Sequence, residues 1–487
     1  MAWRKRSLVW SILLVAITIA ACGGDGTTQP TSTRPDAPSS TPGRTPAAPD
    51  IGADGLDDPY FPELGNGGYD VTSYDLDLRY DPDTRILDGA ATVTAESMQR
   101  LSSFNLDFTG LDVEEVIVDG ETAGFQHADR ELQITPESPI ATDAEFTVVV
   151  EYDGSPAPIE STFGPEIGWI PFRDGAVVIG EPDGASTWFP VNDHPTDKAS
   201  YRFEITVPDD FEVIANGVLS DTSSTGDGWE TWAYEHEGPM ASYLATVAIG
   251  DLVLEEGDPA GDIPIRNAWS ATLADTAAPK FERTHEILTF FQNLFGPYPF
   301  DVYGSMVIDL DLDGLALETQ TIAVFDSTFA AREGSIEDII AHEVAHQWFG
   351  NSVSPESWRD IWLNEGFATY AEYLWIEEST GISVDQQVRE TYRRMQPALE
   401  EPAPGDPGRD RMFAASVYVR GAFTLHALRE ETGDEVFFEI LRTYAERFAH
   451  DNASTGDFIE LAEEIGGDDL ESVLAPWLYA DELPPLP

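Results

Sequence analysis

Cysteine, lysine and long apolar runs are all scarce in this chain of 487 residues. Cys22 is the only cysteine, so no intramolecular disulfide can form, and packing or a metal must hold the fold together. Lysine and arginine together number 26 against 89 acidic residues, which gives a formal net charge of −63. A chain of this charge repels nucleic acid, which we therefore exclude as a partner. We expect a highly solvated acidic surface instead of a specific binding face.

One apolar run stands out, from Leu8 to Ala21, and it is shorter than the roughly 20 residues that a transmembrane helix needs. Basic residues at positions 4–6 precede it and small residues end it, as in an export signal. Its end, Ile19-Ala20-Ala21-Cys22, resembles the lipobox of bacterial lipoproteins, where cleavage leaves a lipid-modified cysteine at the new N-terminus. We expect residues 1–21 to be a lipoprotein signal peptide and Cys22 to anchor an exported protein to the membrane, facing the extracytoplasmic side. The alternative is an ordinary signal in which Cys22 is a small buried residue.

The length favours two or three folded units. Residues 22–56 are rich in Gly, Thr, Pro and Ser, which predicts a disordered tether. From Tyr69 to about Leu254 apolar and polar residues alternate with period two between turn sequences, so we predict an antiparallel β-rich domain over residues 57–255. Beyond it the period becomes helical, and residues 256–487 are predicted to form an α+β domain in which helices predominate.

A candidate metal site lies on a predicted helix from Ile336 to about Phe349, which Ser335 can cap and Gly350 can end. This helix carries His342-Glu343-Val344-Ala345-His346. Histidines four residues apart lie on one helix face, one turn apart, so both imidazoles can bind one zinc ion at roughly 2.0 to 2.1 Å. Glu343 stands beside them and can accept a proton. Because so short a motif also arises by chance, ordinary packing of two histidines is the alternative.

A catalytic zinc ion has three protein ligands and keeps a fourth position for water. The segment from Asp360 to Glu378 is predicted to be a second helix, and Glu365 lies near its start. If the two helices pack antiparallel, Glu365 can present its carboxylate to the metal. We therefore predict one zinc ion per chain, bound by His342, His346 and Glu365.

The pattern His342-Glu343-x-x-His346, followed after eighteen residues by Glu365, resembles the zinc site of the gluzincin metallopeptidases of the M1 aminopeptidase family. Three further landmarks of this family are matched, in the same order, by Trp188–Ala199, Gly296–Pro299 and Trp362–Ala368. The resemblance covers about residues 65–487. It implies a multidomain α and β protein, with an antiparallel β-rich N-terminal domain followed by a thermolysin-like α+β zincin catalytic domain. The β and helical modules that usually follow in the family have no counterpart, so the chain resembles a short form.

The resemblance also implies roles for three further residues. Glu318 takes the place of the glutamate in the family's Gly-Ala-Met-Glu-Asn motif, although only the Ala and Glu positions of that motif match, and would bind the α-ammonium group of a peptide. Glu181 aligns with an N-terminal-domain residue that helps to bind the same amine. Tyr418 lies in a Tyr-x-Arg-Gly segment similar to the family's Tyr-x-Lys-Gly and would donate a hydrogen bond to the oxyanion. The alternatives are solvated glutamates and a tyrosine of the helical core.

The predicted function is zinc-dependent removal of N-terminal residues from peptides with a free N-terminus, in which Glu343 assists the attack of water activated by zinc. A zinc endopeptidase, or a hydrolase of another amide or of an epoxide, is the alternative among enzymes. A lipoprotein that binds peptides and keeps a metal only for stability is the alternative outside enzymes. Glu343 and Tyr418 argue against the last, because a structural zinc site needs neither and usually has four protein ligands. The preferred N-terminal residue and the oligomeric state are left open.

Overall fold

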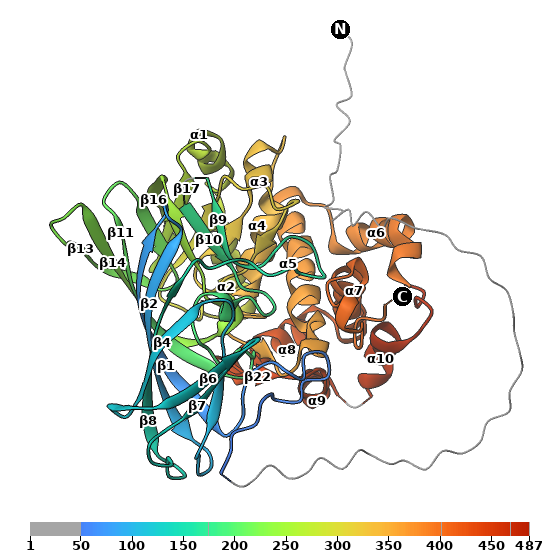
Figure 1. The fold of residues 1–487 in the computed structure, drawn as a ribbon. Helices are drawn as coiled ribbons and strands as arrows, with labels where there is room; N and C mark the ends of the chain where they lie inside the picture. Colours follow the sequence, from blue (N-terminus) through green and yellow to red (C-terminus); the bar gives the residue numbers. More distant parts are fainter. Residues whose placement is uncertain (1–49, 174, 401, 468, 487) are drawn as a thin grey trace, which may run out of the picture.

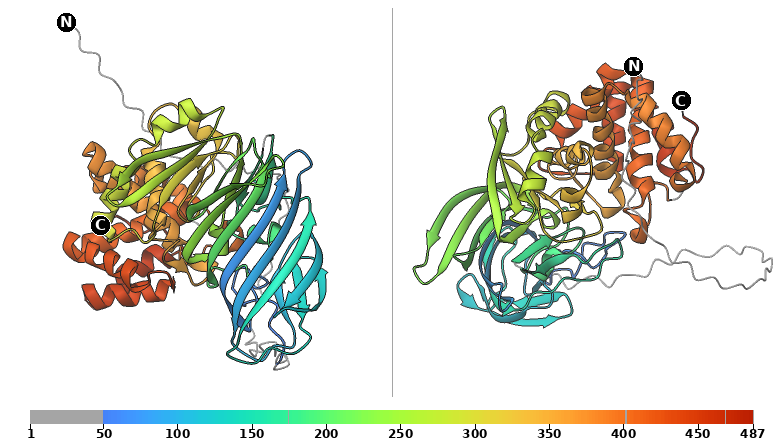
Figure 2. Two further views of the ribbon diagram at one scale, coloured as in Figure 1. Left: turned by 90° about the vertical axis from the view of Figure 1, so that its left-hand side faces the viewer. Right: turned by 90° about the horizontal axis from the view of Figure 1, so that it is seen from above.

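The computed structural model describes residues 50–173, 175–400, 402–467 and 469–486. The predicted signal peptide, Cys22 and most of the predicted tether lie outside these residues. Strands gather on one side of the molecule and helices on the other (Figure 1), and two further views show the blue-to-green strands beside the orange-to-red helices (Figure 2). Within the described ranges, none of the helices has both the length and the apolar character that crossing a bilayer requires.

The N-terminal domain consists almost entirely of strands, with two short 3₁₀ turns, η1 (Ala185–Thr187) and η2 (Ser242–Leu244). The strands are β1 (Tyr69–Asp81), β2 (Ile86–Ser97), β3 (Phe104–Asp107), β4 (Asp112–Val118), β5 (Glu121–Thr122), β6 (Gly124–Ala128), β7 (Glu131–Thr135), β8 (Glu145–Gly154), β9 (Gly168–Phe172), β10 (Gly175–Ile179), β11 (Lys198–Pro208), β12 (Glu212–Ala215), β13 (Val218–Ser224), β14 (Trp229–Ala241) and β15 (Val247–Gly250). They form an eight-stranded sheet in the order β13-β14-β11-β1-β2-β8-β4-β5, a four-stranded sheet in the order β12-β15-β10-β9, and a three-stranded sheet in the order β3-β7-β6. Most neighbouring strands are antiparallel, as predicted, but β1 and β11 are parallel.

The alternation predicted for β1 is confirmed. Tyr74, Leu76 and Leu78 are buried, whereas Asp77 between them is exposed. The apolar face of the eight-stranded sheet packs against the three-stranded sheet, where the rings of Tyr69 and Phe104 meet edge to face with their centroids 5.7 Å apart. The period of two therefore places one face of the strand in a core between two sheets.

The C-terminal domain combines a sheet with helices. Its strands are β16 (Leu252–Ala260), β17 (Ile263–Ser270), β18 (Tyr303–Val307), β19 (Ala316–Leu317), β20 (Ala323–Phe325), β21 (Ser354–Pro355) and β22 (Asn452–Ala453). Its helices are α1 (Ala274–Ala277), η3 (Ala278–Lys280), α2 (Thr284–Phe295), α3 (Ser327–Ala331), α4 (Glu337–His346), η4 (Trp358–Asp360), α5 (Trp362–Thr380), α6 (Val384–Leu399), η5 (Arg409–Arg411), α7 (Ala415–Thr432), α8 (Asp434–Arg447), α9 (Thr455–Gly466) and α10 (Glu471–Tyr479). Five strands form one sheet in the order β16-β17-β18-β20-β19, so β19 lies at its edge. The β-rich domain followed by an α/β domain confirms the predicted fold class.

Two predicted boundaries differ from the structure. The boundary between positions 255 and 256 falls inside β16, and the glycine-rich segment 257–261 that suggested it belongs to the hairpin formed by β16 and β17. The tether was predicted to extend to residue 56, but Gly52 N already donates to Ser103 O over 2.9 Å. Turn-forming residues predict irregular backbone, and irregular backbone can still pack against a domain when its polar groups find partners.

The two domains share an apolar core. Buried residues of the four-stranded sheet, among them Ile179 at the end of β10, pack in one cluster with buried residues of the five-stranded sheet, among them Leu317 in β19. Glu181 follows the first strand and Glu318 follows the second. The shared core therefore fixes the positions of these two glutamates relative to each other.

A half-buried lysine also joins the domains. Lys198 begins β11, and its Nζ donates to the backbone oxygens of Asn351 and Ser352 over 3.1 and 2.9 Å, in the loop that follows α4. Burial lowers the pKa of Lys198 to about 7. The lysine in the predicted N-terminal landmark thus contacts the loop that follows the helix with both histidines.

Candidate metal centre

The two histidines lie on one face of α4, as predicted. The helix begins at Glu337, whose backbone N–H donates to Ser335 Oγ over 3.2 Å, and it ends at His346, three residues earlier than predicted. His342 and His346 are both buried, and their ring centroids are 4.7 Å apart. Apolar residues of α4 pack into the main core, so the helix face that carries the imidazoles is held rigidly.

Glu365, in the first turn of α5, completes a three-residue site. Its Oε2 lies 3.2 Å from His342 Nε2 and 3.6 Å from His346 Nε2. Two ligands of a tetrahedral zinc ion, each at roughly 2.05 Å, are about 3.3 Å apart. The ligand atoms of all three residues lie within 4.8 Å of one another. The two imidazoles and the carboxylate therefore fit a zinc ion.

Hydrogen bonds orient both imidazoles for this role. Nδ1 of His342 lies 2.7 Å from Glu372 Oε1, and Nδ1 of His346 lies 3.0 Å from the backbone oxygen of Phe349. Because these acceptors take the Nδ1 protons, each Nε2 is left to face Glu365 and a metal. The prediction from sequence missed Glu372. Its position seven residues after Glu365, two turns along the same face of α5, is the pattern that could have indicated it.

The pKa values of the site residues also indicate that the site can bind a cation. Burial opposes charge on His342, but Glu365 and Glu372 outweigh it and raise the pKa of this imidazole well above its usual range. Burial likewise opposes charge on Glu365, yet the imidazoles outweigh it and lower its pKa to about 2. Protons thus compensate the carboxylates when the metal is absent. Binding of a divalent cation displaces them, since imidazole ligands must be neutral.

Tyr418 reaches the site because α5 and α7 come unusually close. A Cβ atom on Gly366 would lie 2.9 Å from the Cα of Gly421, so only glycine permits this helix contact. Tyr418 lies one turn before Gly421, and its ring stacks on that of His342 with the centroids 6.0 Å apart. Burial and nearby carboxylates raise the pKa of Tyr418 well above 10. Its hydroxyl therefore keeps its proton and can donate a hydrogen bond.

Glu343 lies on the same buried side of α4. Glu343 is 4% exposed. One of its carboxylate oxygens, a carboxylate oxygen of Glu318 and a ring nitrogen of His346 lie within 4.8 Å of one another. Burial raises the pKa of Glu343 to about 8, while His342 and His346 oppose this rise. A carboxylate with a pKa near neutrality can take up a proton and release it again.

Glu318 is held against α4 by its backbone. Its carbonyl oxygen accepts hydrogen bonds from Gln347 Nε2 over 3.1 Å and from Asn351 Nδ2 over 2.6 Å. Its side chain is buried, which raises its pKa, and Oε1 has no hydrogen-bond partner among the described residues. One carboxylate oxygen each of Glu318, Glu181 and Glu365 lie within 4.8 Å of one another. The structure thus gathers every predicted site residue except Cys22, which it does not describe.

The fold and this site together define a zinc metallopeptidase with a His-Glu-x-x-His helix and a glutamate from the next helix. Family models agree, since the peptidase M1 N-terminal domain matches residues 71–244 and the peptidase family M1 domain matches residues 280–477. The chain belongs to the M1 family of zinc metallopeptidases.

Solved structures resemble the whole described chain. The M1 zinc metallopeptidase of Deinococcus radiodurans is 30% identical, with a TM-score of 0.82, and the similarity covers 89% of this chain and 99% of that one. A mutant of that enzyme bound to a Tyr-Ser-Ala substrate is 31% identical over the same shares, with the same TM-score. The two domains seen here therefore correspond to nearly the whole of the Deinococcus chain.

Curated relatives are longer. Glutamyl aminopeptidase of Bitis rhinoceros is 28% identical over 319 residues, which are 61% of this chain and 33% of that protein. Leukotriene A-4 hydrolase of Xenopus laevis is 24% identical over 452 residues, which are 86% of this chain and 72% of that protein. The chain thus spans about a third of the length of the first curated relatives it matches.

Proposed function

We propose that the protein is a zinc aminopeptidase that removes N-terminal residues from peptides. The observation that carries this proposal is the pair of carboxylates beside the metal site, those of buried Glu318 and half-buried Glu181. Each has a buried oxygen without a hydrogen-bond partner among the described residues. Buried acids of this kind suit a ligand with a positive charge and hydrogen-bond donors, and the α-ammonium group of a peptide provides both.

Each residue of the site has its own role in hydrolysis. Zinc, when bound, polarises the scissile carbonyl and acidifies water. Glu343 accepts the proton of the attacking water and passes it to the leaving nitrogen. Tyr418 donates a hydrogen bond to the oxygen that becomes negative. Glu318 and Glu181 hold the ammonium group, and the free edge of β19 can pair with the extended substrate backbone, so the first peptide bond is placed at the metal.

Relatives support the same substrate class. The Deinococcus enzyme has been solved with the tripeptide substrate Tyr-Ser-Ala, and several curated relatives are named aminopeptidases. An enzyme with an equivalent two-domain chain therefore binds a tripeptide as a substrate.

The test is a comparison of an amino acid p-nitroanilide with its N-acetylated form. We expect kcat/KM for the blocked substrate to be about 100-fold lower, because acetylation removes a charge-assisted contact with buried carboxylates. Glu318→Ala should lower kcat/KM for the free amine by a similar factor and leave the slow cleavage of the blocked substrate unchanged. Equal cleavage of both substrates by the wild-type protein would favour an endopeptidase or another amide hydrolase.

We also propose that Cys22 carries a lipid that anchors the exported protein to a membrane on its extracytoplasmic side. The supporting observation is the basic, apolar and small-residue pattern that ends in the only cysteine of the chain. Expressed in a bacterial host, the wild-type protein is expected in the membrane fraction, with the mass of a chain that begins at lipidated Cys22. Cys22→Ser should release it. A wild-type protein found in the soluble fraction without added mass would contradict the anchor.

A further inference from the structure

The carboxylate of Glu181 depends on its backbone for its position. Glu181 lies in the turn between β10 and η1, and burial together with repulsion from Glu318 raises its pKa well above the usual range. Oε1 of Glu181 is buried without a hydrogen-bond partner among the described residues. Whatever fixes the turn at residues 180–186 therefore fixes where this carboxylate points.

Arg130 binds the part of that turn that follows Glu181. It lies at the hairpin between β6 and β7, on a different sheet, and its Nη1 donates to Asp183 Oδ2 over 3.2 Å. Its Nη2 also lies 3.4 Å from Ser186 Oγ. The guanidinium thus contacts the chain two and five residues after Glu181. Because its two Nη atoms bind at separate points, it fixes both the position and the orientation of the turn.

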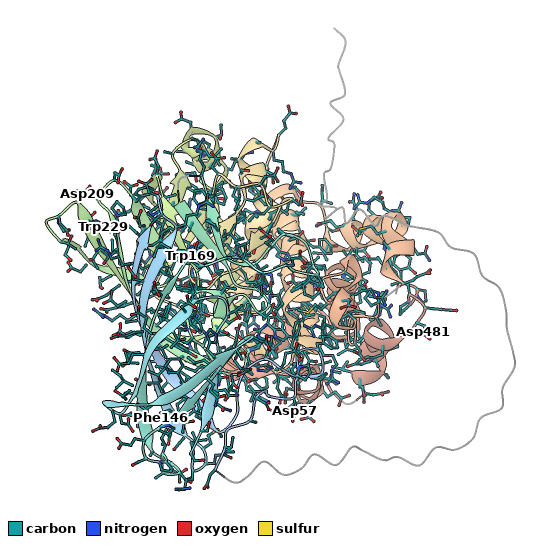
Figure 3. The ribbon with its side chains drawn as sticks, viewed as in Figure 1. Asp57, Phe146, Trp169, Asp209, Trp229 and Asp481 are labelled. Atoms are coloured by element: carbon teal, nitrogen blue, oxygen red, sulfur yellow. The ribbon has the colours of Figure 1, made fainter. Side chains whose placement is uncertain are left out.

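The turn is closed by its own backbone and by Thr187. Gly184 N donates to Gly180 O over 2.7 Å, and Thr187 Oγ1 donates to Gly184 O over 2.7 Å. Thr187 Oγ1 also accepts from the backbone N–H of Trp169, which lies toward the middle of the molecule (Figure 3). The turn therefore has a defined conformation, and Arg130 is a cation that links it to the β6–β7 hairpin of the N-terminal domain.

Two buried aspartates hold Arg130 in place. Oδ1 of Asp107 lies 3.7 Å from its Nε, and Oδ2 of Asp193 lies 3.8 Å from its Nη2. Burial raises the pKa of Asp107 and of Asp193, and the guanidinium opposes this rise. Burial would lower the pKa of Arg130, but the aspartates outweigh it. Arg130 therefore stays charged and is drawn into the cluster that faces the Glu181 turn.

The cluster of Arg130, Asp107 and Asp193 is also connected to α4, the helix with the two histidines, through Ser242 and Tyr243. Asp193 Oδ1 accepts from Ser242 Oγ over 2.7 Å, and the next residue, Tyr243, donates from its hydroxyl to the backbone oxygen of Gly350 over 3.1 Å. Gly350 lies in the loop that follows α4. A Cβ atom on Gly180 would lie 2.4 Å from the backbone oxygen of Tyr243, so the Glu181 turn and this segment touch directly.

We infer that Arg130 is a positioning residue, which sets the place of Glu181 relative to the metal and thereby tunes recognition of the substrate's α-ammonium group. This inference rests on the proposed aminopeptidase function. Arg130 acts through Glu181 and does not touch substrate. Its removal therefore changes how tightly a free N-terminus is bound, and leaves the metal, Glu343 and Tyr418 where they are.

The test is a double-mutant cycle on an amino acid p-nitroanilide. Arg130→Gln and Glu181→Ala are each expected to raise KM about tenfold with kcat retained, and the double variant should be no worse than Glu181→Ala alone, because the two residues act as one unit. Arg130→Lys keeps the positive charge but lacks the two Nη donors of the guanidinium, so its KM should lie between those of the wild type and Arg130→Gln. Asp183→Ala loosens only the turn and leaves Asp107 and Asp193 paired, so it should raise KM in the same direction if Arg130→Gln does not fold.

Arg202→Gln is the matched control. Arg202 also pairs with two carboxylates of the N-terminal domain, Asp75 and Glu204, but on the partly exposed face of β11. Its loss should leave KM unchanged. The inference is overturned if the effects of Arg130→Gln and Glu181→Ala multiply, or if folded Arg130 and Asp183 variants keep the wild-type KM. Failure of the aminopeptidase function itself shows differently, since wild-type protein would then cleave blocked and free substrates equally.

Discussion

Glu343→Gln is expected to lower kcat by about 1,000-fold while zinc stays bound. Glutamine keeps the size of the side chain but cannot accept the proton of the attacking water. Glu343 does not belong to the group formed by His342, His346 and Glu365, so the ligands should remain in place. Steady-state kinetics on an amino acid p-nitroanilide and zinc analysis of the same sample measure both parts of the expectation.

Glu337→Gln provides the control on the same helix. Glu337 lies in the first turn of α4 and pairs with Arg283 at 2.7 Å, away from the metal ligands. Its substitution should leave kcat unchanged. It should lower the stability at most by the small amount that a surface ion pair contributes. Turnover that survives Glu343→Gln at the wild-type level would exclude this residue as the base and require another acceptor for the proton.

The sequence predicted the metal site well because its information is local. Histidines four residues apart must share a helix face, and this geometry needs no knowledge of the rest of the fold. The position of Glu365 depended on two helices packing together, which spacing alone could not establish. The position of Tyr418 depended in the same way on the packing of α5 against α7. The structure shows that Gly366 and Gly421 allow this close approach, and both glycines were visible in the sequence without an assigned partner.

Contacts between distant segments could not be predicted in the same way. Arg130 was one of many charged residues, and its role depends on a hairpin that brings it to Asp183, some fifty positions away in the chain. The predicted domain boundary at position 255 falls inside β16. Its turn-forming residues are typical of a linker, but they are equally typical of a hairpin such as that of β16 and β17. Local patterns define elements, whereas ion pairs across sheets follow from their arrangement in space.

Removing the metal is expected to abolish turnover and to lower Tm by on the order of 10 °C. A ligand present at 1,000 times its Kd stabilises the folded state by about 4 kcal/mol, and each kcal/mol shifts Tm by a few degrees in domains of this size. In the metal-free site, protons on His342 and His346 balance the buried Glu365. Zinc competes with those protons, so the stabilisation should weaken as the pH falls.

Chelation followed by readdition of zinc measures this effect, with activity and Tm followed together. Readded zinc should restore both, and Glu343→Gln should show the full wild-type Tm shift without turnover, because its ligands are intact. Glu365→Gln should behave in the opposite way: it keeps Glu343 but removes the negative ligand between two imidazoles, so both the Tm shift and turnover are lost. A chelated protein that retained its activity and its Tm would show that the three residues hold no functional metal. The pair of variants thus separates loss of the base from loss of the ion.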